Sequence, residues 1–509
     1  MPLSTSPILR IPATFFGIVF LGFGVAYTLY PRAAYPTIGL PSPTTPRDAE
    51  IVDAIMVLFG AKDLFVGLSI LAATWLGNRK VAGLLLMAGS GCAAVDGWVV
   101  NRFTGEGEWN HWGYGVVMGI VGSPEEQRID VTGEHRFIPP DLPKDYRGPC
   151  PALNALSNHG YIPRNGIASI DQIVAASTRV FGFDETFANI AAIYSTAFTV
   201  SPDLNNISIG APLQSSDVLP DKDVKLKIAP QGLEFTHIGL EHDASPTRLD
   251  KYEPSSSGNN YDLSLPLFQQ LLDRQEGIAD HKVNFNIEVL AHHRYQRIQD
   301  SIRNNPKFFF QPFNGCFLQG HKHAVIYRAF ANHSMDHPLG RLDRRTLMSF
   351  YGVQEDGNKL NYDKGGERIP DFWYRRPLDD TYDLRKSNDD LLEMAGYHPD
   401  LIDQYCAGGT SEEQKYDAID IDKLTNGTYK TSTLRDGYNL SCAGFVTSTQ
   451  TAPYWLLKYY DDFGKTVVPR LLAKLPPLIA GLGCSKLDGT LDRKAFEVFL
   501  GFNESLNVP

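Results

Sequence analysis

Apolar segments are concentrated in residues 1–122, whereas polar residues dominate the rest of the chain. The segment 11–30, IPATFFGIVFLGFGVAYTLY, is uncharged, and at about 1.5 Å per residue a helix of this length crosses a bilayer. Further apolar segments follow at 54–77 and 81–100, and a shorter, glycine-rich one at 111–122. Since the first segment ends without a small-residue cleavage site, the pattern predicts a membrane domain of three or four spans rather than a removed signal peptide.

Three charged residues, Lys62, Asp63 and Asp96, lie inside these apolar segments. Charges at that depth are costly and often mark a functional site. The alternative is that they pair with one another or extend to a membrane face. We expect this alternative, in either form, because the sequence contains no proton-relay or transport pattern.

The polar part of the chain has a helical periodicity. Residues 123–149 are rich in proline and charge and predict a linker and the start of a second domain. From Pro151 onward, apolar residues recur at spacings of three and four. The predicted helices cover 153–160, 171–182, 263–277, 286–305 and 454–475, the last interrupted by Pro469. Because long alternating patterns are scarce, the fold class is mostly α: transmembrane helices followed by an all-α domain over 150–509.

The composition excludes some classes of protein. The net charge of −11, from 58 acidic and 47 basic residues among 509, argues against a nucleic-acid partner, which needs a basic face. Six cysteines are too few for a disulfide scaffold, and none forms a CxxC pair, so a structural zinc site is not expected.

The stretch RGPCPALNALSNHGYIPRNG, at 147–166, holds Cys150 between two prolines at the start of a predicted helix. Proline is favoured at the first helical position, so Cys150 is expected to be the N-cap, with its sulfur facing unpaired N–H groups. That environment lowers the pKa of a thiol and favours the thiolate. Such a thiolate is either a nucleophile, which needs a base, or a ligand of haem iron, which needs none. The alternative is a buried cysteine that only caps the helix.

The stretch GLEHDASPTRLD, at 239–250, is a second concentrated patch. Glu241, His242, Asp243 and Ser245 fall within five residues, and such carboxylate, carbonyl and hydroxyl oxygens suit a hard cation. The alternative is an acidic loop in which Asp243 or Ser245 caps the next turn.

Both stretches resemble the haem-thiolate peroxidase family, which includes the fungal chloroperoxidases and unspecific peroxygenases. Its Pro-Cys-Pro, Asn-Ala-Leu and His-Gly-Tyr motifs all stand at 149–161. The resemblance implies that Cys150 ligates the iron of haem b. It also implies that Glu241, the backbone of His242 and Ser245 bind Mg²⁺ or Mn²⁺ beside a haem propionate, with the His242 side chain near bound peroxide.

The family's distal acid–base is absent from the expected position. In longer members a glutamate lies seven residues after an arginine. Matching the asparagine–proline pair and the phenylalanines of 297–321 puts Asn314 at the arginine position and His321 at the glutamate position. Either His321, helped by His242, moves the proton, or peroxide chemistry is weak and the domain binds haem in another role. His323 is a competing candidate if the alignment shifts.

The sequence also gives expectations for two further histidines, for two cysteines and for N-glycosylation sites. His292 and His293 lie in a predicted helix as ordinary surface or packing residues. The resemblance implies a disulfide between Cys442 and Cys484. Sequons, which suit a secretory lumen, begin at Asn206, Asn332, Asn426, Asn439 and Asn503.

The resemblance implies a reaction and a location. The expected activity is H₂O₂-dependent oxidation or oxygenation of a small apolar molecule, such as a secondary metabolite delivered by the membrane. By the positive-inside rule, Arg10, Arg79 and Lys80 lie in the cytoplasm. Three spans then place the haem domain in the lumen, and four place it in the cytosol. The N-terminal region is similar to a small four-helix fungal membrane domain of unknown function.

Overall fold

The chain forms two compact units. The computed structural model describes residues 10–39, 42–76, 79–122, 127–237, 239–357 and 359–506. Unit 1 comprises Met1–Gln127 with Pro377–Asp379, and unit 2 comprises Arg128–Arg376 with Asp380–Pro509.

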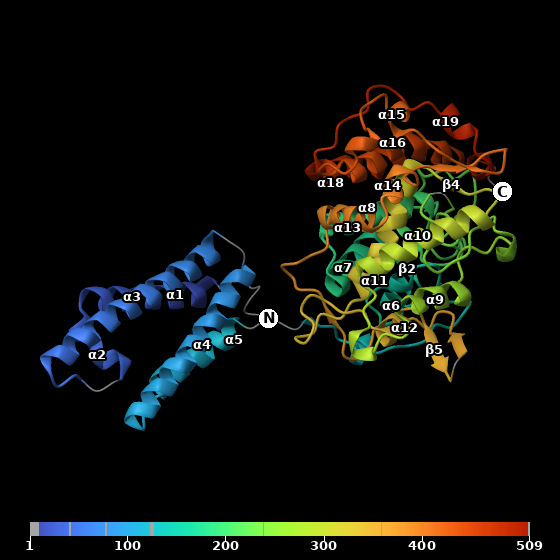
Figure 1. Cartoon of the computed structure of the whole chain (residues 1–509). Coiled ribbons are helices and arrows are strands. Elements are labelled where there is room, and N and C mark those ends of the chain that lie inside the picture. Colours follow the sequence, from blue (N-terminus) through green and yellow to red (C-terminus); the bar gives the residue numbers. More distant parts are fainter. Residues whose placement is uncertain are drawn as a thin grey trace. The chain divides into compact units, whose positions relative to one another are not determined.

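Unit 1 consists of helices, shown in blue in Figure 1. They are α1 (Arg10–Leu29), α2 (Pro31–Ile38), α3 (Pro46–Trp75), α4 (Arg79–Thr104) and α5 (Trp109–Gly122). Within the described ranges, three helices are long and apolar enough to cross a bilayer: Arg10–Leu29, Pro46–Trp75 and Val81–Thr104. These are the three long spans that the sequence predicts. The fourth apolar segment forms α5, whose 14 residues are fewer than the roughly 20 that a bilayer requires.

Glycines bring α1 and α3 into close contact. A Cβ atom at Gly60 would lie 2.8 Å from the carbonyl oxygen of Gly24, and one at Gly67 would lie 2.8 Å from that of Gly17. Only glycine fits at such distances, and small residues of this kind allow transmembrane helices to pack backbone against backbone.

Lys62, Asp63 and Asp96, the charged residues inside the apolar segments, pair with one another, which is one of the two expected outcomes. Lys62 Nζ lies 3.5 Å from Asp63 Oδ1 and 3.6 Å from Asp96 Oδ2. The pairing lowers the cost of placing these charges among apolar helices.

Unit 2 is mostly helical, with short strands, so the predicted fold class is confirmed. Its helices are α6 (Pro151–Asn158), α7 (Ile170–Phe181), α8 (Glu185–Phe198), α9 (Leu265–Leu272), α10 (Ile287–Asn304), α11 (Gln319–Phe330), α12 (Arg344–Phe350), α13 (Leu384–Tyr397), α14 (Asp400–Asp403), α15 (Ile421–Leu424), α16 (Asn439–Tyr459), α17 (Val467–Arg470), α18 (Leu475–Ile479), α19 (Lys494–Glu497) and α20 (Leu500–Ser505). The strands are β1 (Gln127–Arg128), β2 (Ile167–Ser169), β3 (Asn206–Ser208), β4 (Phe309–Phe310), β5 (Val353–Asp356), β6 (Lys359–Tyr362), β7 (Tyr374–Arg375), β8 (Gly408–Thr410) and β9 (Tyr416–Ala418).

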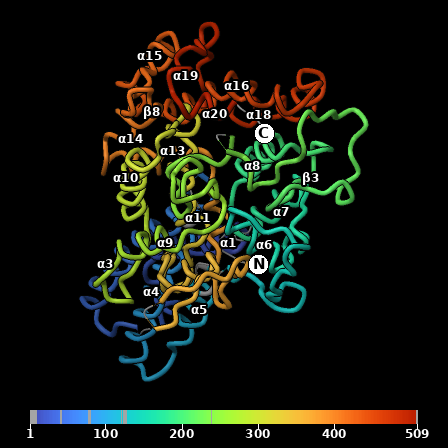
Figure 2. The backbone as a smooth tube through the Cα atoms, turned by 90° about the vertical axis from the view of Figure 1, so that its right-hand side faces the viewer, coloured from blue at the N-terminus to red at the C-terminus, as the bar shows by residue number. Residues whose placement is uncertain are grey.

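The strands form small antiparallel pairings, β2 with β3, β5 with β6, and β8 between β4 and β9. Helices α10, α11 and α13 pack against one another. A π-helical segment, η6 (Phe313–Leu318), leads directly into α11 and packs on α16. The C-terminal helices α15, α16, α19 and α20 gather at one end of unit 2 (Figures 1 and 2).

Most predicted helices of unit 2 are present. The helix predicted at 171–182 is α7, which begins at a capping box between Ser169 and Gln172 and ends at Gly182 with φ 68°. Those predicted at 153–160, 263–277 and 286–305 correspond to α6, α9 and α10.

The prediction of a helix over 454–475 is confirmed only in part, because the helix is broken at Tyr460 and resumes as the short α17. Helix α16 begins at Asn439 and ends at Tyr459, and Tyr460 adopts an extended conformation. The helix ends there because the backbone pairs with a distant segment: the N–H of Lys227 donates to the carbonyl of Tyr459 (2.8 Å), and the N–H of Asp461 donates to that of Lys225 (2.8 Å). Local periodicity does not contain this information.

Two disulfides lie in unit 2. Cys442 and Cys484 are bonded, which confirms the expected pair, and Cys316 is bonded to Cys406, which the sequence did not predict. Cys92 and Cys150 are free.

We expect the disulfide between Cys442 and Cys484 to stabilise unit 2, because it closes a loop with a sequence separation of 42. The double variant Cys442→Ser/Cys484→Ser should lose about 2–4 kcal/mol of unfolding free energy and melt several degrees lower. The measurement is thermal unfolding of the full chain in detergent, followed by circular dichroism without reductant. Cys92→Ser is the matched control, and a double variant that melts like this control would contradict the expectation.

Candidate active site

Cys150 is the N-cap of α6, with Pro151 as the first helical residue. The loop that carries the thiol is held by Asn154 of the same helix. The Asn154 side chain accepts from the N–H of Gly148 (3.1 Å), donates to the carbonyl of Gly148 (2.9 Å) and donates to Glu367 Oε1 (2.9 Å). The position of Cys150 is therefore fixed both by its own helix and by a segment more than 200 residues away.

The histidine of the His-Gly-Tyr motif is a second fixed point. His159 is fully buried, and its Nδ1 lies 2.7 Å from the carbonyl oxygen of His135, to which it donates. Its Nε2 accepts from the N–H of Ile369 (3.2 Å). Asn158, the preceding residue, donates to the carbonyls of Gly365 (2.7 Å) and Glu367 (2.8 Å). These side chains bind the 365–369 segment to α6.

Burial raises the pKa of the Cys150 thiol, so the expected lowering of this pKa is wrong for the free thiol. The N–H groups of Leu153 and Ala152 and the positive charges of Arg248 and Lys322 act in the opposite direction but do not outweigh burial. A metal deprotonates a coordinating thiol outright. A bound metal ion would therefore favour the thiolate at this position.

The second predicted motif contains two polar atoms without partners. Glu241 Oε2 lies 2.5 Å from His237 Nδ1, whereas Glu241 Oε1 is buried and has no hydrogen-bond partner among the described residues. His242 Nδ1 donates to the carbonyl of Asp243 (2.7 Å), and its buried Nε2 is likewise unpartnered there. Burial lowers the pKa of His242 well below its ordinary value, so the ring is neutral and Nε2 is a free acceptor.

Helices α10 and α11 fix this loop. Arg297 donates to the carbonyl of Ser245 (3.0 Å), and Gln319 donates to the carbonyl of Ala244 (3.1 Å). The carboxylate of Asp243 accepts from the N–H of Phe309 in β4 (2.9 Å). The motif is thus a rigid part of the core rather than an exposed acidic loop.

His321 lies on α11, directly after η6. Its Nδ1 lies 2.9 Å from Ser387 Oγ, and its ring stacks on Phe317 (5.4 Å between centroids, 2° between planes). Phe187 contacts the ring edge-on at 5.0 Å. Burial lowers the pKa of His321 to about 3. None of these described contacts joins His321 to His242.

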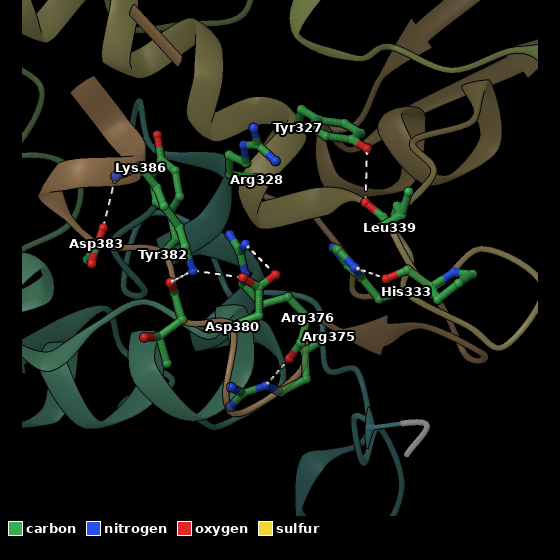
Figure 3. A network of polar contacts seen from close by, with 12 residues as sticks. Tyr327, Arg328, His333, Leu339, Arg375, Arg376, Asp380, Tyr382, Asp383 and Lys386 are labelled. Carbon is green, nitrogen blue, oxygen red and sulfur yellow. Dashed lines mark hydrogen bonds and ion pairs between the residues drawn. The ribbon is translucent and has the colours of Figure 1, made fainter. Parts of the chain in front are cut away.

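Tyr382 lies in a polar network (Figure 3). Its ring lies 6.2 Å from that of His321 at an angle of 15°. The Tyr382 hydroxyl donates to Asp390 (2.8 Å). Two residues before Tyr382, Asp380 accepts from Lys386 (2.7 Å). The aromatic surroundings of His321 are therefore held in place by hydrogen bonds and ion pairs.

Lys322, the next residue of α11, is the site residue that sequence reasoning missed. Its Nζ donates to the carbonyl of Leu240, the neighbour of Glu241. Burial lowers the pKa of Lys322 to about 8, while the negative charges of Glu241 and Cys150 oppose that shift. The ammonium also lowers the pKa values of His242 and His321. It thus lies within electrostatic reach of both predicted motifs and of His321.

Cys150, His321 and Lys322 are all partly buried residues of unit 2. The positive charge of Lys322 acts on the pKa of both the Cys150 thiol and the His321 ring, so the three side chains lie within electrostatic reach of one another. The structure therefore brings the Cys150 thiol, the Glu241–His242 loop and the start of α11 into one region.

The remaining predicted candidates lie within the core. His323 is fully buried, its Nδ1 donates to the carbonyl of Gln319 (3.0 Å), and its ring lies 5.5 Å from that of His293, which is also fully buried. His292 is partly buried, 2.8 Å from His398. Asn314 is fully buried in η6.

The residues present fit a haem. The free thiol offers a soft anionic ligand for iron, and Arg248 and Lys322 offer positive charge for propionates. The predicted divalent cation at Glu241, the His242 carbonyl and Ser245 stays a prediction. Among the described residues no group of three or more His, Cys, Asp or Glu side chains could hold a metal, and the predicted set contains only one side chain of these types, Glu241.

Comparisons with known proteins agree with this geometry. Residues 135–378 match the family described as "Peroxidase, family 2", and residues 17–123 match the "Domain of unknown function (DUF4267)".

Three curated relatives are similar over most of unit 2. "Dothistromin biosynthesis peroxidase dotB" of Dothistroma septosporum is 35% identical over 381 residues, which is 74% of this chain and 87% of the relative. "Aromatic peroxidase fscJ" of Fusarium equiseti is 34% identical over 350 residues, 66% of this chain and 78% of the relative. "Aromatic peroxygenase" of Cyclocybe aegerita is 30% identical over 333 residues, 62% of this chain and 81% of the relative.

His159 makes the stability of unit 2 depend on pH. Burial lowers the pKa of His159 from 6.5 to about 4. Between these values the unfolded chain binds the proton that the folded chain excludes, so the stabilisation is complete above about pH 6.5 and is lost as the pH falls towards 4, by up to about 1.4 kcal/mol per pH unit.

The measurement is urea unfolding between pH 4 and 7, comparing the parent chain with His159→Gln, which removes this titrating group. We expect a shallower pH dependence in the variant. Parallel curves for the two proteins would show that His159 does not carry this dependence.

Proposed function

The chain belongs to the family 2 peroxidases and is an oxidoreductase that acts on peroxide, and from this premise we propose a more specific function. We propose that it is a haem-thiolate peroxidase or peroxygenase, attached to a membrane by residues 1–122, that uses H₂O₂ to oxidise or oxygenate a small apolar molecule. The observation that carries the proposal is the free Cys150 at the N-terminus of α6, within electrostatic reach of Lys322, the residue that follows His321.

Cys150 would hold the iron of haem b, and Arg248 and Lys322 would pair with the propionates. Bound haem with a thiolate ligand supplies the redox chemistry, since the thiolate donates electron density that favours cleavage of the O–O bond. The resemblance also implies Mg²⁺ or Mn²⁺ at Glu241, the His242 carbonyl and Ser245, and this ion remains a prediction.

The protein must move a proton between the two peroxide oxygens. His242 Nε2 is a neutral, unpartnered acceptor, and His321 has a hydrogen bond described only at Nδ1. We propose that His321 moves the proton with the help of His242. The aromatic rings around His321, among them Phe187, Phe317 and Tyr382, exclude water and favour an apolar substrate.

A second candidate function is haem binding without peroxygenase turnover. It is supported by the pKa of His321. Burial lowers this pKa to about 3, and an imidazole with such a low pKa is a weak base. The two candidates differ in turnover and not in haem ligation.

The proposed setting is a lumenal or extracellular face of the membrane and a role in secondary metabolism. Two disulfides in unit 2 suit an oxidising compartment. One relative is named for the biosynthesis of dothistromin, which supports a secondary metabolite as substrate.

The spectrum of the reduced, CO-bound protein tests the ligand. We expect a Soret band of the thiolate type in the parent chain and in Cys92→Ala, and its loss in Cys150→Ala, because iron then has no sulfur ligand. A band that persists in Cys150→Ala, or that is absent from the parent, would refute the assignment of Cys150.

Peroxide-dependent turnover of a generic aromatic substrate tests the proton transfer. We expect His321→Ala to lower kcat/KM by about 10²–10⁴-fold at unchanged haem content, since general acid–base catalysis contributes that much. His242→Ala is measured alongside, and His337→Ala serves as the matched histidine control.

Equal rates for His321→Ala and the parent would remove His321 from the mechanism. A parent protein with a thiolate spectrum and no turnover would favour the second candidate function.

A further inference from the structure

We propose that unit 1 contains a binding site for a small, uncharged hydrophobic molecule that carries a hydroxyl group, with Asp96 as the acceptor for that hydroxyl. The site is a cavity of about 350 Å³ between helices α2, α3 and α4. The inference goes beyond the proposed function, because it concerns the unit that matches a domain of unknown function and needs no haem.

The cavity has mostly apolar walls, to which three helices contribute. Met56 and Phe59 of α3 and Val100 of α4 line it, and Met56 and Val100 are each 1% exposed. Ile55 and Val95, which also line it, are 48% and 59% exposed. The cavity therefore has a buried base and an apolar mouth at the surface of unit 1. Its volume lies within the range of small-molecule sites, about 300–1,000 Å³.

Asp96 is the one charged side chain among the described residues that line this cavity. Lys62 Nζ lies 3.6 Å from Asp96 Oδ2, which is close enough for an ion pair but too far for a hydrogen bond. The described part of the chain gives the Asp96 carboxylate no hydrogen-bond donor. A carboxylate among apolar side chains is costly without a donor, and an ionisable residue inside a membrane-spanning segment often marks a functional site. A ligand in the cavity supplies the donor.

The surroundings of Asp96 indicate an uncharged donor. The ammonium of Lys62 lies 4.2 Å from the centroid of the Phe59 ring and 3.5 Å from Asp63 Oδ1, so a cation already occupies one side of the Asp96 carboxylate. A ligand must also pass the apolar mouth of the cavity, where burying a charge costs far more than burying a hydroxyl. An alcohol or a phenol meets both conditions, whereas a lipid acyl chain has no donor for the carboxylate.

Contacts between helices hold the walls in place. The hydroxyl of Tyr35, a lining residue of α2, donates to Asp53 of α3 and lies 3.1 Å from the carbonyl oxygen of Ala49 in the same helix. At the end of α2, His111 Nε2 of α5 donates to the carbonyl of Ile38 (3.0 Å), another lining residue. Helix α2 is thus fixed to α3 and to α5, and a cavity whose walls are already fixed costs a ligand less ordering on binding.

The test is photolabelling of the full-length protein in phospholipid nanodiscs with para-hydroxybenzophenone, followed by digestion and mass spectrometry. A photoexcited benzophenone inserts into C–H bonds beside it, so the labels report where the probe lies. We expect saturable labelling at Met56, and weaker labelling there by benzophenone itself, which lacks the hydroxyl. Met87 of α4, which is 42% exposed and does not line the cavity, reports probe dissolved in the lipid.

Variants at the cavity test the acceptor. Asp96→Leu should raise the half-saturating probe concentration at Met56 at least about tenfold, because a hydrogen bond to a charged acceptor is lost. Val99→Trp fills the cavity but keeps the carboxylate, and it should abolish saturable labelling, which keeps the inference testable if Asp96→Leu does not fold. Glu50→Leu, at an exposed carboxylate of α3 that does not line the cavity, is the matched control and should label like the parent.

Non-saturable labelling that is equal at Met56 and Met87 would overturn the inference, and so would equal labelling at Met56 by the two probes. A folded Asp96→Leu or Val99→Trp protein that labels like the parent would also contradict it. These outcomes leave the proposed function of unit 2 intact, because none of them depends on haem ligation or turnover.

Discussion

The site depends on a thiol that is held where burial opposes its ionisation. Burial raises the pKa of Cys150 above its ordinary value, although helix α6 directs N–H groups at the sulfur and Arg248 and Lys322 add positive charge. A reactive thiolate would need a lower pKa. A raised pKa suits a metal ligand better than a nucleophile, because a bound metal ion would deprotonate the thiol. The hydrogen bonds between Asn154 and Gly148 fix the loop that carries this thiol.

The sequence predicted the parts that local pattern and motif encode. The three long apolar helices, the helices around Cys150 and the disulfide between Cys442 and Cys484 all follow from periodicity, length or family resemblance. The end of α16 and the disulfide between Cys316 and Cys406 depend on contacts between distant segments, which periodicity does not reveal. The predicted direction of the Cys150 pKa shift was wrong for a related reason. Burial in the folded domain raises this pKa by more than the N–H groups at the helix terminus lower it.

Lys322 could be found only in the folded chain. In the sequence it is one charged residue between two histidines, and only the packing of α11 brings its ammonium to the carbonyl beside Glu241. The same packing surrounds His321 with aromatic rings and lowers its pKa. Family resemblance identified the loop of Glu241 and His242. Lys322, whose ammonium lies beside this loop, could be recognised only from the tertiary structure.

The central claim is that Cys150 is the axial ligand of a haem iron, and X-ray absorption at the iron edge of the haem-loaded protein tests it most directly. The account predicts one sulfur scatterer bound to iron in the parent chain and none in Cys150→Ala. An iron coordinated only by nitrogen and oxygen in the parent chain would contradict it.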